Sequence, residues 1–213
     1  MKQLVIIGAR GFGREVYIWA TLSLGYNVDW TIKGFLDDKY DALDHLEYPL
    51  PILSSVEDYL VQPNDLFICA LGAPILKAKY IKLVIDKGGV FTNLIHPTVI
   101  ITGHLKKLGR GVILCAYSMI STDCSIGDFV TVQPFSIIGH DVEISEGCHL
   151  GAYSFVGGYA KLEHNVTLHT RATIIPGIII GAQSIVGVGS VVLKDVSQNV
   201  TVFGNPARVF KLG

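Results

Sequence analysis

The chain has 213 residues, which is enough for one or two domains and for a sizeable core without disulfides or metals. Half of the residues are hydrophobic and only 16% are charged, which excludes disorder over most of the chain. The 17 basic and 18 acidic residues give a net charge of −1, so we expect neither a nucleic acid nor an anionic membrane as partner. The four cysteines form no CxxC pair, which favours buried, reduced thiols.

Two apolar stretches were considered as targeting or membrane segments. The run from Leu4 to Ala9 is too short for the apolar part of a signal peptide, and a glycine-rich loop follows it. The stretch from Ile174 to Leu193 has the length of a membrane helix, but Pro176 and several glycines interrupt it. We therefore expect a cytoplasmic protein without membrane insertion.

The first part of the chain alternates between strand and helix patterns, which indicates a small parallel α/β unit. Its first apolar run is of the kind found in strands that are buried on both faces. The expected elements are a strand at 4–7, a glycine loop at 8–13, a helix at 14–24, a strand ending at 34–36, a strand at 66–71 and a helix at 73–87. This order predicts a Rossmann-like, nucleotide-binding domain over residues 1–93.

The glycine loop and two acidic residues are the candidates for binding a nucleotide. The spacing Gly8-x-x-Gly11-x-Gly13 can place amide groups at a helix N-terminus against a phosphate, but it is not the dinucleotide fingerprint. Asp37 and Asp38 follow a strand at the edge where ligands bind in such sheets. From these residues alone, a plain strand-to-helix turn and a solvated acidic turn are equally good interpretations.

A period of six residues runs through the second part of the chain. Every sixth residue is aliphatic in the series Leu108, Leu114, Ile120, Ile126, Val132, Ile138, Ile144, Leu150, Val156, Leu162, Leu168, Ile174, Ile180, Val186 and Val192. A small or β-branched residue stands two places before nearly all of them, and a glycine often follows. Hexapeptide repeats of this kind build a parallel β-helix in which the aliphatic side chains point inward.

Three hexads complete one triangular coil, so residues eighteen apart should stack on the same side of the β-helix. We expect the fifteen hexads to make five coils, with positive φ at the corners supplied by glycine, Asn and Asp. The predicted fold is therefore a Rossmann-like α/β unit followed by a left-handed parallel β-helix over residues 94–213, with the handedness taken from the resemblance described next.

Several motifs together resemble one enzyme family. They are Gly8-x-Arg10-Gly11-x-Gly13, Gly34-Phe35-Leu36-Asp37-Asp38, the hexads, Gly139-His140-Asp141, Gly147-Cys148-His149-Leu150-Gly151 and Gly204-Asn205-Pro206-Ala207. In this combination the chain resembles the nucleotide-linked amino-sugar N-acetyltransferases, a family that also contains the sialic-acid O-acetyltransferases. The hexads alone indicate only the larger superfamily of acyltransferases.

The resemblance implies a homotrimer that uses acetyl-CoA and acts on a UDP- or dTDP-linked amino-deoxy sugar for surface-glycan assembly. It implies that His140 is the general base, that Asp141 supports it and that the amide of Gly158 serves the oxyanion. Residues implied to bind acetyl-CoA are His149, Gly158, Thr170, Gly187 and Gly189. Residues implied to bind the nucleotide sugar are Gly8, Arg10, Gly11, Phe12, Asp37, Asp38 and Gly72. The sequence departs from the family pattern at Arg10, Phe12 and Asp141. It also has Ala73 and Pro74 after Gly72, where the family often has amide side chains.

The residue types fit this chemistry on their own terms. Transfer of an acetyl group to an amine needs a base that titrates near neutral pH, and histidine is the natural choice. Gly158 lies eighteen residues after His140, so the two should share a corner. His149 lies nine residues after His140, so these two histidines should point to different sides, and a shared site would need two subunits.

Other interpretations remain open from the sequence. An O-acetyltransferase of a sialic-acid-like sugar would use the same base, and a non-catalytic, nucleotide-sugar-binding trimer would have the same fold. His164 and His169 resemble a pair in zinc enzymes built on this fold, but the position of the expected third ligand is Asp128. We therefore expect no metal.

Overall fold

The computed structural model describes residues 1–210, so the last three residues of the expected second domain lie outside it. The chain divides into two compact units, Met1–Pro97 and a second unit that begins at Thr98. Within the described residues, no helix combines the length and the apolar character needed to cross a membrane.

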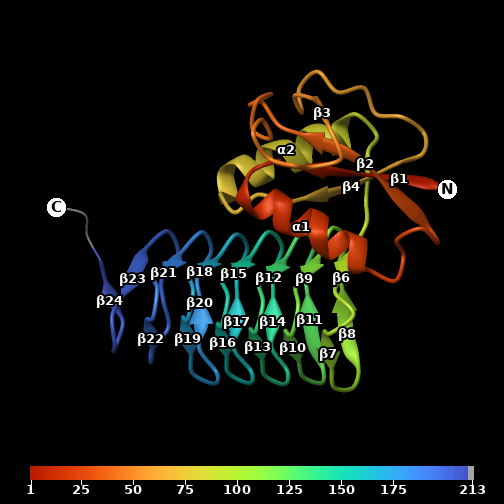
Figure 1. Ribbon diagram of the computed structural model, residues 1–213. Coiled ribbons are helices and arrows are strands. Elements are labelled where there is room, and N and C mark those ends of the chain that lie inside the picture. The colour runs from red at the N-terminus through yellow and green to blue at the C-terminus, as the bar shows by residue number, and fades with distance from the viewer. Residues whose placement is uncertain (211–213) are drawn as a thin grey trace. The chain divides into compact units, whose positions relative to one another are not determined.

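The first unit is a parallel sheet with two helices (Figure 1). The strands are β1 (Lys2–Ile7), β2 (Trp30–Leu36), β3 (Ile52–Ser54), β4 (Asp65–Cys69) and β5 (Val90–Phe91), and the helices are α1 (Gly11–Leu22) and α2 (Pro74–Asp86). The sheet order is β3-β2-β1-β4-β5. The three expected strands and both helices are present, and β3 and β5 are additional.

The strand order places β1 between β2 and β4. The strands that follow β1 in the chain are therefore added first on one side of it, as β2 and β3, and then on the other side, as β4 and β5. Ile7 is paired with Leu36 on one side and with Cys69 on the other. The loops that follow these three strands therefore leave the sheet at one edge. In open α/β sheets such a switch point is where ligands bind.

The second unit is built from three sheets whose strands stack along the β-helix (Figure 1). The six-stranded sheet consists of β7 (Ile100–Ile101), β10 (Met119–Ile120), β13 (Ile137–Ile138), β16 (Phe155–Val156), β19 (Thr173–Ile174) and β22 (Val191–Val192). The five-stranded sheet consists of β8 (Leu105–Leu108), β11 (Cys124–Ile126), β14 (Glu143–Ile144), β17 (Lys161–Leu162) and β20 (Ile179–Ile180).

The third sheet has eight strands, and the first of them in the chain, β6, precedes the boundary at Pro97. They are β6 (Leu94–Ile95), β9 (Ile113–Leu114), β12 (Thr131–Val132), β15 (His149–Leu150), β18 (Thr167–Leu168), β21 (Ile185–Val186), β23 (Thr201–Phe203) and β24 (Arg208–Val209). The pairing Met119↔Ile137↔Phe155 recurs along the β-helix and confirms the expected period of eighteen residues.

The aliphatic series forms the core of the β-helix, as the hexads predict. From Leu114 to Val192 its members are at most 2% exposed. Leu108 is the exception, because it is 36% exposed. The register shifts within β8, where Leu105 is paired with Cys124 but Lys107 is paired with Ser125. This β-bulge leaves Leu108 in the regular period, because Leu108 is paired with the buried Ile126. Leu108 is exposed because β8 is the last strand of its sheet, so no further strand of that sheet covers it.

The residues with positive φ at the corners are not only the glycine, Asn and Asp residues that were expected. Every sixth residue from Gly111 to Gly189 has a φ near +60°, whatever its type. Asp123, Asp141 and Asn165 are among them, as expected, but so are several aromatic residues. The glycines that follow the aliphatic residues do not have positive φ.

Those glycines have a steric role instead. A Cβ added at Gly127 would lie 2.7 Å from the backbone nitrogen of Glu146 in the next coil. A Cβ at Gly157 would lie 2.5 Å from the backbone nitrogen of Pro176. These positions therefore need glycine because successive coils approach too closely there for any side chain.

We predict that Gly127→Ala lowers the free energy of unfolding by about 1–3 kcal/mol, the usual cost of overpacking. The added methyl group must push the backbone of the next coil away, because no flexible side chain lies in between. Urea denaturation followed by circular dichroism measures the change. The matched control is Ser145→Ala, at the equivalent position one coil later, which should be nearly neutral. Equal midpoints for G127A and wild type would contradict the steric role.

Candidate functional site

His140 and Asp141 lie at the corner between β13 and β14, where the chain leaves the six-stranded sheet for the five-stranded one. The Nδ1 atom of His140 lies 3.0 Å from Oδ2 of Asp141. The His140 side chain is 52% exposed and that of Asp141 is 29% exposed. A carboxylate that accepts from Nδ1–H leaves the lone pair of Nε2 free, so this pair can act as an oriented base.

Gly158 lies one coil beyond His140, directly against the imidazole. A Cβ added at Gly158 would be 2.8 Å from Nε2 and 2.9 Å from Cε1 of His140. Glycine at this position therefore makes room for the ring, and it brings the backbone of residue 158 next to Nε2. The expected stacking of His140 on Gly158 is present.

Two further side chains complete this corner. The ring of Tyr159 meets the His140 ring edge-on, with the centroids 4.9 Å apart. Lys106 Nζ donates to Oδ1 of Asp141 at 3.1 Å. The pKa of the Asp141 carboxyl is lowered below its ordinary value. The hydrogen bond with His140 has the largest effect, and the one from Lys106 has the next largest. Asp141 therefore stays ionised, and each of its oxygens has a different partner.

Neither Tyr159 nor Lys106 was expected at this corner from the sequence. Tyr159 follows Asp141 by eighteen residues, so the coil period could have identified it. Lys106 stands two places before Leu108, where other hexads carry a small or β-branched residue. A lysine at that position was a visible irregularity, but only the register shift in β8 explains where its side chain goes.

His149 lies away from this corner, as expected from its spacing. It belongs to β15 of the eight-stranded sheet, where it is paired with Thr131 and Thr167. Its side chain is half-buried on the eight-stranded sheet. His140 lies at the corner between the six-stranded and the five-stranded sheet. One chain therefore does not bring the two histidines to the same corner.

The other residues expected to bind acetyl-CoA lie at a third place. Thr170, Gly187 and Gly189 belong to the corner between the eight-stranded and the six-stranded sheet. The Gly189 amide donates to the Thr170 carbonyl at 3.0 Å. The six-stranded sheet separates this corner from that of His140.

An apolar cavity of about 500 Å³ adjoins this corner. His169, Ile185, Gly187, Val188, Thr201, Phe203 and Phe210 line it. A Cβ added at Gly187 would lie 2.2 Å from the Phe203 ring, so glycine is required there for packing. The cavity has the apolar walls that a thiol cofactor's organic chain can use.

In the first unit, the glycine loop is shaped by one close approach. A Cβ added at Gly13 would lie 1.9 Å from the Gly8 carbonyl oxygen, and Gly8 itself has a φ of +99°. At Gly11, by contrast, a Cβ would meet nothing within 4 Å. The amides of residues 11–13 form the first turn of α1, where no intrahelical acceptor exists. This turn therefore offers amide donors and open space to an anion.

The acidic residues after β2 have different roles. Asp37 is buried and holds the loop, because its carboxylate accepts from Ala9 N–H and from Lys39 N–H, each at 2.9 Å. The Arg10 guanidinium lies 3.7 Å from the same carboxylate and is largely exposed. Asp38 is exposed and accepts a hydrogen bond from the Tyr80 hydroxyl. The pKa of the Tyr80 hydroxyl is raised, mainly because it is buried and next because it donates to the Asp38 carboxylate.

The two remaining candidates lie near the same loops. Phe12 belongs to the first turn of α1, and its ring packs edge-on against Trp19 with the centroids 6.1 Å apart. Gly72 is exposed between β4 and α2. Over residues 1–210, no three His, Cys, Asp or Glu side chains come together in a way that could hold a metal ion, and His164 and His169 gain no third ligand.

Two family models match the chain. The PglD N-terminal domain matches residues 3–84, and the bacterial transferase hexapeptide model of six repeats matches residues 123–158. The GDP-perosamine N-acetyltransferase of Escherichia coli O157:H7 is 33% identical over 162 residues, which cover 67% of this chain and 72% of that protein. A galactoside O-acetyltransferase of E. coli K12 is 36% identical over 90 residues, but these cover only 43% of that protein.

Solved structures are similar over nearly the whole chain. PerB from Caulobacter crescentus, in complex with CoA and GDP-perosamine, has a TM-score of 0.86 and 27% identity, and the match covers 99% of this chain and 98% of that one. The acetyltransferase domain of PglB from Neisseria gonorrhoeae, in complex with acetyl coenzyme A, has a TM-score of 0.85 over 98% of this chain and 99% of that one, but at 21% identity it supports the fold alone.

The glycine loop, the hexapeptide coils and the His140 corner thus occur together in a chain that matches these enzymes in sequence and in fold. The relative from E. coli O157:H7 is matched over more than two thirds of its length. The chain belongs to the family of nucleotide-linked amino-sugar N-acetyltransferases and sialic-acid O-acetyltransferases, enzymes with a left-handed β-helix that use acetyl-CoA as the acetyl donor.

Proposed function

We propose that this enzyme transfers the acetyl group of acetyl-CoA to the amino group of a GDP-linked amino-deoxy sugar. The observation that carries the proposal is the His140–Asp141 pair, with Nδ1 held at 3.0 Å from the carboxylate and Nε2 facing Gly158. The nucleotide is revised from the expected UDP or dTDP to GDP, because the E. coli relative and PerB are both named for GDP-perosamine.

The proposed reaction is a direct attack of the amine on the thioester. His140 Nε2 takes the proton that the amine loses as the C–N bond forms and the C–S bond breaks, and it returns this proton to the departing CoA sulfur. Asp141 keeps the other ring nitrogen protonated, so that Nε2 is the basic atom. The backbone of Gly158 lies close to the imidazole, and its amide would stabilise the oxyanion, because glycine allows a close approach.

The proposal divides the substrates between the two units. The first turn of α1, with its open space at Gly11, would bind the diphosphate of the nucleotide. Asp38 would contact the nucleotide, while Asp37 would act by holding the loop. Acetyl-CoA would bind along the β-helix, where the cavity at Gly187 supports its binding. We further propose that the enzyme works in the cytoplasm, in the assembly of a surface glycan.

Because His140, His149 and the corner of Thr170 lie at three different places on one chain, we propose a homotrimer. In such a trimer, the acetyl-CoA residues of one copy would join the base of another in one site. The interior of the β-helix is filled by aliphatic side chains, so acetyl-CoA would have to bind on its outer surface.

We predict that His140→Ala lowers kcat about 10²–10⁴-fold, the usual contribution of a positioned general base. The KM for the sugar should change little, because proton transfer stabilises the transition state more than the bound substrate. Asp141→Asn should have a smaller effect, because it removes only the orientation of the ring. Release of free CoA from acetyl-CoA and GDP-perosamine measures the rates.

A panel of acceptors belongs to the same experiment. If CoA is released with hydroxyl acceptors and not with amino sugars, the enzyme is an O-acetyltransferase. If neither class of acceptor is acetylated although the nucleotide sugar binds, the binding-only alternative is correct. Near-wild-type kcat in H140A at pH 7 would show that His140 is a corner residue without a role in proton transfer.

We predict that Gly11→Val raises the KM for the nucleotide sugar and leaves the KM for acetyl-CoA nearly unchanged. The side chain would enter the open space in which the diphosphate is proposed to lie, and its Cβ would have no neighbouring side chain within 4 Å. Steady-state kinetics with each substrate varied in turn measures both constants. The control is Glu15→Val, which introduces the same side chain at an exposed position of the same helix. Equal rises in both constants would contradict the division between the units.

We predict a homotrimer in solution, with about three times the chain mass of 23.1 kDa. Light scattering coupled to size-exclusion chromatography measures the mass at several protein concentrations. The same fractions should be assayed for acetyl transfer. A stable monomer with full activity would contradict a site that is shared between copies.

A further inference from the structure

Lys106 owes its position to a β-bulge. In the regular period, Cys124 would be paired with residue 106, but it is paired with Leu105, and the next pair is Lys107↔Ser125. Lys106 is therefore the extra residue of the bulged strand. Bulges frequently re-aim a side chain and are common beside active sites.

The bulge keeps a charged side chain out of the core. Positions two places before the aliphatic residues point inward, and Cys124 and Val112 are fully buried there. Lys106 occupies such a position in the repeat, yet its side chain is 53% exposed. It extends past the corner of Asp123 in the neighbouring coil, and its Nζ donates to Asp141 Oδ1 at 3.1 Å.

This arrangement gives each oxygen of Asp141 one partner. Oδ1 accepts from Lys106, and Oδ2 faces Nδ1 of His140 at 3.0 Å. With one oxygen held by an ammonium on a separate strand, the carboxylate has less freedom to rotate away from the imidazole. The ring of Tyr159 and the backbone of Gly158 limit His140 from the other side.

We propose that Lys106 is a positioning residue for acetyl transfer, which holds Asp141 so that its second oxygen fixes the tautomer and orientation of His140. This inference rests on the proposed function, because it assigns Lys106 a role in the reaction of the same site. Lys106 does not touch the reacting atoms in this role. It acts through Asp141.

Other charged and titratable groups surround this pair. Asp123 and Glu143 are near enough to Lys106 to raise its pKa, although Asp141 has the largest effect. Burial raises the pKa of the neighbouring Cys124 thiol. Tyr159 touches the imidazole. Asp123 accepts a hydrogen bond from the Thr122 hydroxyl at 3.0 Å, whereas Asp141 is the carboxylate that lies within hydrogen-bond distance of Lys106 Nζ.

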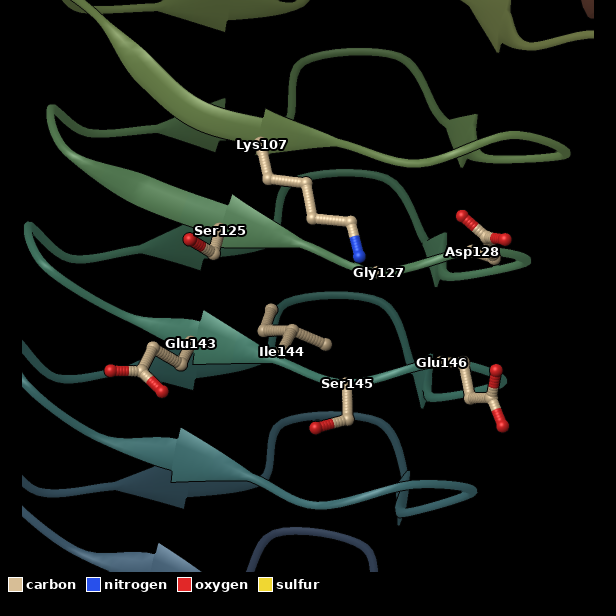
Figure 2. Close-up of a pocket in the computed structure, with 8 residues that line it drawn as sticks. All are labelled: Lys107, Ser125, Gly127, Asp128, Glu143, Ile144, Ser145 and Glu146. Atoms are coloured by element: carbon tan, nitrogen blue, oxygen red, sulfur yellow. The ribbon is translucent and has the colours of Figure 1, made fainter.

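The test compares Lys106→Met with Lys107→Met, a matched control on the same strand. Figure 2 shows that Lys107 extends across the five-stranded sheet toward Gly127, over a groove of about 300 Å³ that Glu143 and Ser145 also line. The control therefore removes the same charge from the same strand without touching the Lys106–Asp141 contact.

For K106M we expect a fall in kcat of about two- to fivefold, the range of exposed ion pairs, with unchanged KM values. K106R should restore most of the loss, because arginine can donate to the same oxygen. In an Asp141→Asn background, K106M should have no further effect. High salt should shrink the difference between wild type and K106M, because the pair is exposed to solvent. K107M should behave as wild type.

A second readout does not depend on activity. The pKa of the Asp141 carboxyl, followed by ¹³C NMR of labelled aspartate without substrates, should rise in K106M and stay unchanged in K107M. An unchanged Asp141 pKa in K106M, or equal losses of kcat in K106M and K107M, would overturn the proposal. If the Asp141 pKa rises but the wild type acetylates no sugar, the ion pair stands and the proposed function fails, and with it the role of Lys106 in catalysis.

Discussion

The hydrogen bonds between successive coils, repeated at a period of eighteen residues, are the constraint on which the site depends. They place the backbone of residue 158 beside His140 without any direct link between the two residues. They also bring the coils so close that several corner positions accept only glycine. The same geometry that stabilises the β-helix therefore provides the room for the imidazole and brings the backbone of Gly158 next to it.

Asp141 connects this backbone geometry to the electrostatics of the site. Its positive φ is that of a corner residue, and the residue six places away in either direction has it too. What distinguishes Asp141 is that its carboxylate lies between an imidazole and an ammonium. Hydrogen bonds to the ionised form lower its pKa, so the carboxylate remains available to orient His140 even in mildly acidic solution.

The sequence was informative wherever one period controls the structure, and uninformative where the period breaks. The hexads predicted the β-helix, and the spacing of His140 and Gly158 predicted their contact. The aim of Lys106 follows from one extra residue in β8, which no six-residue pattern can reveal. The exposure of Leu108 follows from the place of β8 at the end of its sheet. The role of Gly127 could not be predicted either, because the distance between coils is a property of the assembled backbone.

The first unit shows why motif residues cannot all be given the same role. Asp37 and Asp38 are adjacent in the sequence, but the carboxylate of Asp37 is occupied by the backbone amides of Lys39 in its own loop and of Ala9 in the glycine loop. In the glycine loop after β1, Gly13 is fixed by contact with Gly8, whereas Gly11 borders open space. Under the proposed function, the buried members of each motif would shape the binding edge, and the exposed members would contact the ligand. Changes of nucleotide within the family should therefore concentrate at exposed positions such as Arg10 and Asp38, because substitutions there leave the sheet intact.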